Sequence, residues 1–326
     1  MERLDGFMAR ANAAYYATRD PYADFTTSPE ITQVFGEVLG LWAAITWEAM
    51  GRPDPVLLVE CGPGRGTLMA DALRAAGGVA APFAAALRVH LVETSPRLRA
   101  QQAARVPNAT WHDALEQVPP GPFILLANEF LDALPIRQLV RRGDGWAERF
   151  VGDGAFVERP AATPDTEVMT TEEGAIVELC EPARAIAGHV ARRVLRDGGA
   201  ALFLDYGPAE SAPGDSLQAL HAGRPANPLV EAGSADLTAH VDFAALAQTA
   251  RAAGAAVHGP VAQGLFLTRL GLFQRTGRLA QTQPPARAAA LVQAAQRLAE
   301  PDRMGRLFKA LAICHPRLPC PPGFEP

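Results

Sequence analysis

Cysteine is scarce in this chain, and no two cysteines have the spacing of a metal site. The 326 residues contain four, Cys61, Cys180, Cys314 and Cys320, without a C-x-x-C pair. Four are too few for a disulfide framework in a chain of this length. Cys314 stands beside His315, but no further ligands complete a tetrahedral site, so we expect no structural metal. G-x-S-x-G and H-E-x-x-H motifs are also absent.

Long apolar runs and an excess of basic residues are missing as well. No run approaches the roughly 18 residues that cross a bilayer, and residues 1–5 do not resemble a signal peptide. We therefore expect a cytoplasmic protein without a membrane-inserted segment. The formal net charge of −5 argues against general nucleic-acid binding, which needs a basic face. With 48% hydrophobic and 20% charged residues, the chain can fill a sizeable core.

Three glycines at alternate positions follow a short apolar run. Residues 57–67 read LLVECGPGRGT, with Glu60 before Gly62, Gly64 and Gly66. Glycine tolerates positive φ and lets a ligand lie against the backbone, and a following helix begins with free N–H groups. The segment predicts a strand, a tight loop and a helix that together bind a nucleotide-like cofactor. An ordinary strand-to-helix turn is the alternative.

The carboxylate of Glu60 helps to separate two classes of cofactor. A dinucleotide brings a pyrophosphate to such a loop, where a neighbouring carboxylate repels it, whereas S-adenosylmethionine carries a cationic sulfonium. The G-x-G-x-G spacing also departs from the G-x-G-x-x-G of dinucleotide sites, although Arg65 is a positive charge that a phosphate can use. The residues favour S-adenosylmethionine.

Two further acidic residues end the next predicted strands. Glu93 follows the apolar run 87–92, where a carboxylate accepts hydrogen bonds from both ribose hydroxyls. Capping of the helix that starts at Ser95-Pro96 is the alternative. Asp113 ends the run 108–113 and is expected to reach an adenine amino group, with turn chemistry as the alternative. Both positions support nucleoside binding without choosing between the two cofactors.

Apolar runs alternate with helical periodicity along most of the chain, which predicts an α/β fold with a doubly wound sheet. Residues up to about 52 are expected to be helical, with Ser28 as N-cap and Pro29 as the first helical residue. Helices are also expected around 182–196, ending at Gly198-Gly199, and over 276–300. The expected strands lie near 56–60, 88–93, 109–111, 122–127, 200–205, 257–261 and 307–313.

Two segments interrupt this rhythm. Residues 137–158 alternate apolar and polar side chains around Gly143-Asp144-Gly145, which predicts a hairpin outside the main sheet. Residues 208–237 are rich in Pro, Gly, Ala and Ser with little periodicity, and we interpret them as a substrate cover, with a disordered connector as the alternative. The predicted organisation is an N-terminal helical extension over 1–52 and a cofactor-binding domain over 53–326, with insertions near 137–180 and 208–240.

Polar residues follow the fourth predicted strand directly. Ligands of open α/β sheets bind beyond the carboxyl ends of the strands, which is where Asn128, Glu129 and Asp132 lie. If a helical turn begins after Asn128, Glu129 and Asp132 share one face and form a two-carboxylate cradle. Acids favoured at a helix N-terminus are the alternative. We assign Asn128 to the cofactor and the two carboxylates to the substrate.

Ordered motifs along nearly the whole chain resemble the MidA-type methyltransferases, whose mitochondrial members are complex I assembly factors. Besides Glu60 to Gly66, they include Asn128-Glu129-Phe130 with Asp132-Ala133-Leu134-Pro135. Two differences stand out: residues 20–25 are shorter than the family's glycine-containing turn, and Cys61 replaces an aliphatic residue. The other matches are Tyr15-Tyr16, Arg19-Asp20-Pro21, Asp24-Phe25, Ser28-Pro29-Glu30-Ile31, Phe35-Gly36-Glu37, Glu93 with Ser95-Pro96, Asp205-Tyr206-Gly207, Asp236 to Phe243, Gln263-Gly264, Met304-Gly305 and Leu307-Phe308-Lys309.

The resemblance implies a Rossmann-type, doubly wound and mostly parallel seven-stranded sheet that binds S-adenosyl-L-methionine. It implies a protein-arginine methyltransferase whose substrate is a subunit of the respiratory NADH dehydrogenase, complex I. A guanidinium is protonated at neutral pH, so a carboxylate has to localise its charge or remove a proton. On this hypothesis Glu129 and Asp132 hold the arginine, and one of them or His240 accepts the proton. For His240, a place in a turn before a helix capped by Asp242 is the alternative.

Two other functions keep the cofactor site. The chain can be an assembly or binding factor that carries an S-adenosylmethionine site, or a methyltransferase of small molecules. The acidic pair suits a cationic arginine, whereas the apolar Phe130, Leu131 and Phe266 suit a protein segment or a hydrophobic small substrate.

Overall fold

The structure, a computed structural model, describes residues 1–19, 26–166, 168, 170–221, 223–230 and 232–325. The chain divides into two units, each described by itself below. The first unit comprises Met1–Phe25, Leu131–Ile186 and Gly207–Leu246, and the second comprises Thr26–Phe130, Ala187–Tyr206 and Ala247–Pro326. The organisation expected from the sequence, an extension over 1–52 and a domain over 53–326, stays a prediction.

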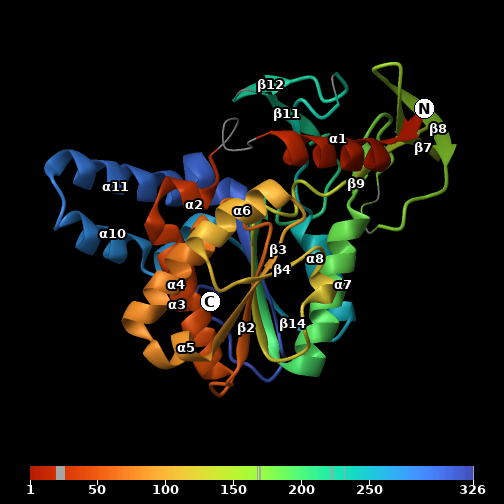
Figure 1. Cartoon of the computed structure of the whole chain (residues 1–326). Coiled ribbons are helices and arrows are strands. Elements are labelled where there is room, and N and C mark those ends of the chain that lie inside the picture. The colour runs from red at the N-terminus through yellow and green to blue at the C-terminus, as the bar shows by residue number, and fades with distance from the viewer. Residues whose placement is uncertain (20–25, 167, 169, 222, 231, 326) are drawn as a thin grey trace. The chain divides into compact units, whose positions relative to one another are not determined.

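A seven-stranded sheet forms the centre of the second unit (Figure 1). Its order is β14-β15-β10-β5-β2-β3-β4; the five strands from β10 to β4 pair in parallel, and β15 runs antiparallel to both of its neighbours. All seven predicted strands are confirmed to within one residue; the apolar runs of the central β2 and β5 are buried throughout, as is typical of strands covered on both faces. Their bounds are β2 Val56–Cys61, β3 Leu87–Val92, β4 Thr110–His112, β5 Phe123–Asn128, β10 Gly199–Tyr206, β14 Ala256–Ala262 and β15 Phe308–Cys314.

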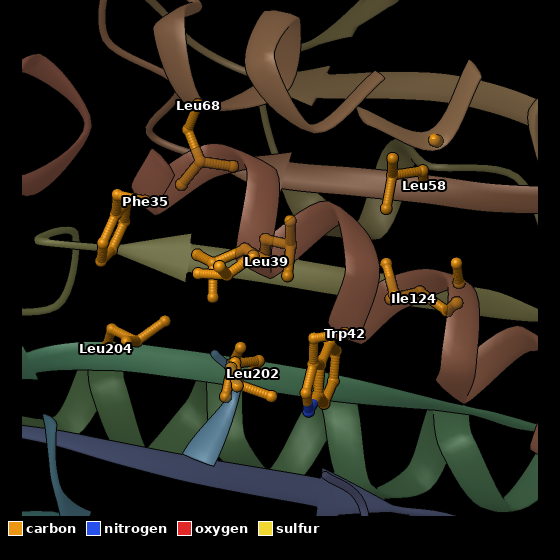
Figure 2. Close-up of a cluster of buried hydrophobic side chains, with 14 of the residues drawn as sticks. Phe35, Leu39, Trp42, Leu58, Leu68, Ile124, Leu202 and Leu204 are labelled. Carbon is orange, nitrogen blue, oxygen red and sulfur yellow. The ribbon is translucent and has the colours of Figure 1, made fainter. Parts of the chain in front are cut away.

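Helix α3 (Gln33–Ala49) and helix α4 (Thr67–Val79) cover one face of this sheet, and α7 and α8 lie on the other (Figure 1). Figure 2 shows Phe35, Leu39 and Trp42 of α3 directed at aliphatic side chains of β2, β5 and β10. These side chains are fully buried, so removal of one leaves a cavity that costs about 2–5 kcal/mol. The other helices of this unit, with the two that continue into it, are α2 Ser28–Ile31, α5 Ala81–Ala86, α6 Pro96–Arg105, the 3₁₀ turn Leu115–Gln117, α7 Glu181–Asp197, α8 Phe243–Ala252, α9 Gln263–Arg269, α10 Leu272–Ala280, α11 Pro285–Ala299 and the π turn Pro301–Gly305.

Two helical predictions need correction. The helix expected from Ser28 onward is broken at Thr32, which is extended with φ −159° and ψ 138°, so that Thr27 rather than Ser28 is the N-cap of α2. The Thr32 side chain accepts a hydrogen bond from the backbone N–H of Val34 and thereby caps α3. The helix expected over 276–300 is likewise two helices, α10 and α11, because Pro284 and Pro285 interrupt the backbone hydrogen bonds between them.

The first unit contains helix α1 (Leu4–Thr18) and two small sheets. The hairpin predicted at 137–158 is confirmed as β6 and β7, within a sheet of the order β1-β7-β6-β9 in which β8 also pairs with β7. The segment 208–237 is more regular than expected, since β11 pairs with both β12 and β13. The bounds are β1 Glu2–Arg3, β6 Arg137–Arg142, β7 Gly145–Gly152, β8 Ala155–Ala161, β9 Ile176–Leu179, β11 Gln218–His221, β12 Arg224–Ala226 and β13 Asp236–Thr238.

Within the described part of the chain, no helix has the length and apolar character that spanning a bilayer requires. No cluster of three or more metal-ligating side chains occurs among the described residues. The four cysteines are free thiols. The shortened turn at 20–25, to which the family resemblance drew attention, lies outside the described residues.

Candidate cofactor and active site

The loop between β2 and α4 has positive φ at each of its three glycines. The φ angles are +64° at Gly62, +53° at Gly64 and +79° at Gly66. Gly66 is the N-cap of α4. Because glycine has no side chain, Gly66 cannot accept a hydrogen bond from the first N–H groups of the helix with a capping side chain. A Cβ on Gly62 would lie 2.8 Å from Cδ2 of Phe130. The predicted strand, tight loop and helix are therefore confirmed, with bare backbone at the carboxyl end of β2.

Glu60 is buried beside this loop, with 3% of its surface exposed. Burial raises its pKa to about 8, although a hydrogen bond from the backbone of Met69 acts in the opposite direction. Its Oε2 atom has no hydrogen-bond partner among the residues that the structure describes. A buried carboxylate oxygen without a donor is costly, so a cationic or donating ligand next to Glu60 stabilises it.

Glu93 leaves β3 and is held by its own loop and by α6. Its Oε1 accepts from the backbone N–H of Ser95 at 2.8 Å, and its Oε2 accepts from Nε2 of Gln102 at 3.3 Å. Burial raises the pKa of Glu93, while these hydrogen bonds lower it in part. Ser95 itself accepts from the N–H of Leu98 and is the N-cap of α6. The carboxylate is thus positioned by a capping turn, and its predicted contact with a ribose stays a prediction.

Gln102 is a residue that the sequence analysis missed. Its side chain is fully buried, and its Nε2 donates to the carbonyl of Gly64 at 2.7 Å as well as to Glu93. Its Oε1 accepts from the indole N–H of Trp111 at 2.8 Å. Gln102 therefore ties the glycine loop, the Glu93 loop and β4 to one another. A buried glutamine in a surface helix leaves no sequence signal that distinguishes it from its neighbour Gln101.

Asp113 lies at the exit of β4 and is exposed. Its Oδ1 accepts from Nη2 of Arg99 at 2.7 Å, and Nε of Arg99 donates to the carbonyl of Glu93 at 2.7 Å. Its backbone N–H donates to Oε1 of Gln117. The carboxylate is in a surface ion pair of small energetic weight, and its assignment to adenine stays a prediction.

The exit of β5 brings Asn128 and Glu129 together. Glu129 has a left-handed φ of +47°, and its Oε1 accepts from the N–H of Ser28 at 2.7 Å and from Nδ2 of Asn128 at 3.1 Å. Burial raises the pKa of Glu129 despite these donors. Oδ1 of Asn128 is buried and has no partner within the described chain. The side chains of Asn128 and Glu129 thus orient each other at the end of β5, and Oδ1 of Asn128 is left to accept a hydrogen bond from a ligand.

The helical turn expected after Asn128 is wrong, and so is the alternative of acids at a helix N-terminus. Residues 129–134 form bends and a turn without a helix. The physical reason is that the N–H of Glu129 is bound by the carbonyl of Leu204 at 2.9 Å and the N–H of Phe130 by Oδ2 of Asp205 at 3.1 Å. Both donors are bound to β10 and to the side chain of Asp205, and they hold Glu129 at a left-handed φ of +47°, which a right-handed helical turn cannot include.

Asp132 belongs to the first unit, where it is buried with 8% exposure. The hydroxyl of Tyr16 donates to Oδ1 of Asp236 at 2.9 Å, and burial raises the pKa of Tyr16 well above its ordinary value, with the charges of Asp236 and Asp132 adding to the effect. Asp132 therefore lies in an acidic environment of its own unit. The cradle that pairs Asp132 with Glu129 stays a prediction.

His240 is an exposed residue of the first unit, and its backbone N–H donates to Oγ of Ser216 at 2.8 Å. The neighbouring Asp242 accepts from the backbone N–H of Ala245 at 2.9 Å and from Oγ of Ser211 at 2.7 Å. The alternative interpretation of Asp242, a cap of the helix that starts at Phe243, is therefore confirmed. A role of His240 as proton acceptor stays a prediction.

The fold and the loop chemistry define a nucleoside-binding α/β protein, and the comparisons give its class. A family described as S-adenosyl-L-methionine-dependent methyltransferases matches residues 38–261. The chain is 36% identical to the Drosophila melanogaster protein arginine methyltransferase NDUFAF7 homolog, mitochondrial, over 96% of this chain and 80% of that protein. Its identity to the human protein arginine methyltransferase NDUFAF7, mitochondrial, is 35%, over 93% of this chain and 77% of that protein. A Burkholderia thailandensis structure bound to S-adenosyl-homocysteine has a TM-score of 0.78 and 26% identity, covering 99% of this chain and 88% of that one.

The chain belongs to this family of methyltransferases, and its cofactor is S-adenosyl-L-methionine. The family resemblance and the cofactor predicted from the sequence are confirmed. The residues of the second unit fit this cofactor, because the loop of three glycines leaves bare backbone and Oε2 of Glu60 is a buried oxygen in need of a partner. A carboxylate in that place favours a cationic ligand over a pyrophosphate.

Proposed function

We propose that this protein transfers a methyl group to a guanidinium nitrogen of an arginine in a protein substrate. The observation that carries the proposal is the identity of about one third, over more than nine tenths of this chain, to proteins named protein arginine methyltransferase NDUFAF7. The half-buried carboxylate of Glu129 at the exit of β5 supports it, since an arginine guanidinium pairs well with a carboxylate.

The chemistry follows from the charge of the acceptor. When bound, S-adenosyl-L-methionine supplies an electrophilic methyl group on a sulfonium. A guanidinium has a pKa above about 12, so its nitrogen has no usable lone pair until its charge is localised or a proton leaves. Glu129 has one oxygen held by two donors, which fixes its orientation, and a raised pKa makes it a stronger proton acceptor than an exposed carboxylate. In this proposal Glu129 binds the guanidinium and takes the proton, with Asp132 and His240 as further candidates for these two roles.

We propose that the substrate is a subunit of the respiratory NADH dehydrogenase, and that the protein acts in the cytoplasm. The name NDUFAF7, which relatives in a fly and a human share, supports the substrate; the cytoplasmic location carries over the expectation from the sequence. Mass spectrometry of NADH dehydrogenase purified from cells with and without this protein tests the substrate. We expect one arginine to lose its methylation in the absence of the protein, and an unchanged methylation pattern would refute this substrate.

An assembly factor with a cofactor site is the second function to test. The purified subunit, incubated with this protein and S-adenosylmethionine labelled in its methyl group, separates the two functions. Label on an arginine supports the methyltransferase, whereas tight binding of the subunit without label supports the assembly factor. Label on small metabolites of a cell extract, with none on protein, supports a methyltransferase of small molecules.

A further inference from the structure

A groove of about 420 Å³ lies on the second unit between α3, α4 and α10, which adjoin one another in Figure 1. Its volume is in the range of small-molecule sites, about 300–1,000 Å³. The groove meets α4 at Arg74, Ala75 and Gly78, whereas the cofactor loop precedes the first residue of the same helix. At about 1.5 Å per residue, Gly78 and Gly66 are about 18 Å apart along the helix axis. The groove is therefore separate from the cofactor loop.

Apolar side chains and glycines form most of its walls. Val38 and Leu41 come from α3, and Leu270 and Gly271 come from the segment before α10. Leu41 is 38% exposed, which is high for a leucine on a helix that otherwise packs against the sheet. Gly78 adds no side chain to the wall, and a Cβ placed on it would meet no atom within 4 Å. A hydrocarbon or an aromatic ring placed here buries apolar surface on several sides.

Three guanidinium groups line the same groove. Glu37 is 4% exposed and binds two of them: Nη1 of Arg74 lies 2.5 Å from its Oε1, and Nε of Arg275 lies 2.6 Å from its Oε2. Nη2 of Arg74 also lies 2.5 Å from Oδ1 of Asp71. The guanidinium of Arg278 has no hydrogen-bond or ion-pair partner among the residues that the structure describes. Three positive and two negative charges leave a net charge of +1, which one monoanion neutralises.

We propose that this groove binds an amphiphilic monoanion, a small molecule with an apolar body and a single carboxylate. The apolar body lies against Val38, Leu41 and Leu270, and the carboxylate pairs with Arg278. Arg275 is held in place by Glu37 and offers a further N–H group at the same rim. A dianion suits the site less, because Glu37 and Asp71 already neutralise two of the three guanidiniums. The proposal does not depend on the methyl acceptor of the enzyme.

Isothermal titration calorimetry of the full chain with decanoate tests the proposal, with decanol as the uncharged control. We expect saturable binding of decanoate at one site and at least tenfold weaker binding of decanol. Saturating S-adenosyl-homocysteine should leave the decanoate affinity unchanged, because the cofactor loop is elsewhere. Absence of decanoate binding, equal binding of decanol, or competition with S-adenosyl-homocysteine would overturn the proposal.

Two adjacent glycines of α4 provide a matched pair of variants. Gly78→Leu fills the groove, whereas Gly77→Leu changes a helical neighbour that does not line it and whose added Cβ also meets no atom within 4 Å. Leucine favours a helix more than glycine does, so both variants should fold. Gly78→Leu should abolish decanoate binding and Gly77→Leu should preserve it; equal affinities of the two variants would refute the groove as the site.

The charge of the site is tested in the same way. Arg278→Ala should weaken decanoate binding about tenfold, because of the three arginines that line the groove it removes the one without a counter-charge among the described residues. Arg287→Ala removes an arginine of α11 that does not line the groove, and should leave the affinity unchanged. Equal losses in the two variants would mean that only the general charge of the surface attracts the anion, and would contradict a specific site.

Discussion

Ionisation of Glu60 should control the affinity of this protein for S-adenosylmethionine. Glu60 is 3% exposed, and burial raises its pKa to about 8. The sulfonium of the cofactor favours the ionised carboxylate, so binding below pH 8 has to release the proton that the free protein holds on Glu60. The affinity should therefore fall as the pH is lowered through the pKa of the folded protein.

The size of the effect follows from the pKa. If only the protein with ionised Glu60 binds the cofactor, the apparent Kd equals the Kd of that form multiplied by 1 + 10^(pKa − pH), where the pKa is that of Glu60 in the free protein. With a pKa of about 8, the factor is about 2 at pH 8, about 10 at pH 7 and about 100 at pH 6. Stability of the cofactor-free protein has the opposite slope, because the folded state binds the proton more tightly than the unfolded state. The free energy of unfolding should fall between pH 4.5 and 8, by at most about 5 kcal/mol.

Calorimetric titration with S-adenosylmethionine between pH 6 and 9 measures the effect in the wild type and in Glu60→Gln. The amide cannot titrate, so the variant retains only the ionisations of the cofactor and of the other groups of the site, Glu93 among them, which are common to both proteins. S-adenosyl-homocysteine, which lacks the sulfonium, should show a weaker dependence on pH in the wild type. The same pH profile in both proteins would refute the electrostatic role of Glu60.

Three further variants, two of them with a matched control, test the site. Glu129→Gln should reduce turnover at least about a hundredfold with little change in cofactor affinity, as measured by methyl transfer and calorimetry; normal turnover would contradict its role as proton acceptor. Gly62→Ala should weaken cofactor binding, because the φ of +64° at Gly62 and the ring of Phe130, 2.8 Å from the added Cβ, both oppose a side chain. Its control Gly77→Ala should leave the thermal stability unchanged or raise it by up to about 1 kcal/mol. Gln102→Leu should lower the free energy of unfolding by about 3 kcal/mol, because it leaves buried hydrogen-bonding groups unpaired. Its control Gln101→Leu should lie within about 0.5 kcal/mol of the wild type in urea unfolding, and equal stabilities of the two variants would contradict a structural role of Gln102.

Prediction from the sequence succeeded where a local pattern has one physical cause. Each strand of the seven-stranded sheet was placed to within one residue, and the central strands β2 and β5 give the clearest signal because their apolar runs are buried throughout. The glycine loop was recognised for a similar reason, because positive φ at Gly62, Gly64 and Gly66 excludes most other residues. The start of α6 at Ser95-Pro96 was recognised because proline is favoured in the first turn of a helix.

Prediction failed where a distant residue decides the local conformation. The helix expected after Asn128 does not form, because backbone donors of Glu129 and Phe130 are bound by Leu204 and Asp205, which are some 75 residues away in the sequence. The strands within 208–237 were missed for a related reason, since they depend on backbone pairing that composition does not reveal.

The amino-acid sequence by itself determined the class of fold, the glycine loop and the acidic residues that favour a cationic cofactor, because these depend on residue type and on contacts within a few positions. Only the tertiary structure decided the chemical state of those residues. Burial raises the pKa of Glu60, Gln102 joins the glycine loop, the Glu93 loop and β4, and Glu37 holds two arginines at the rim of a groove, all through partners far apart in the chain. Hydrogen bonding and desolvation depend on which atoms surround a group, and those neighbours are set by the fold as a whole.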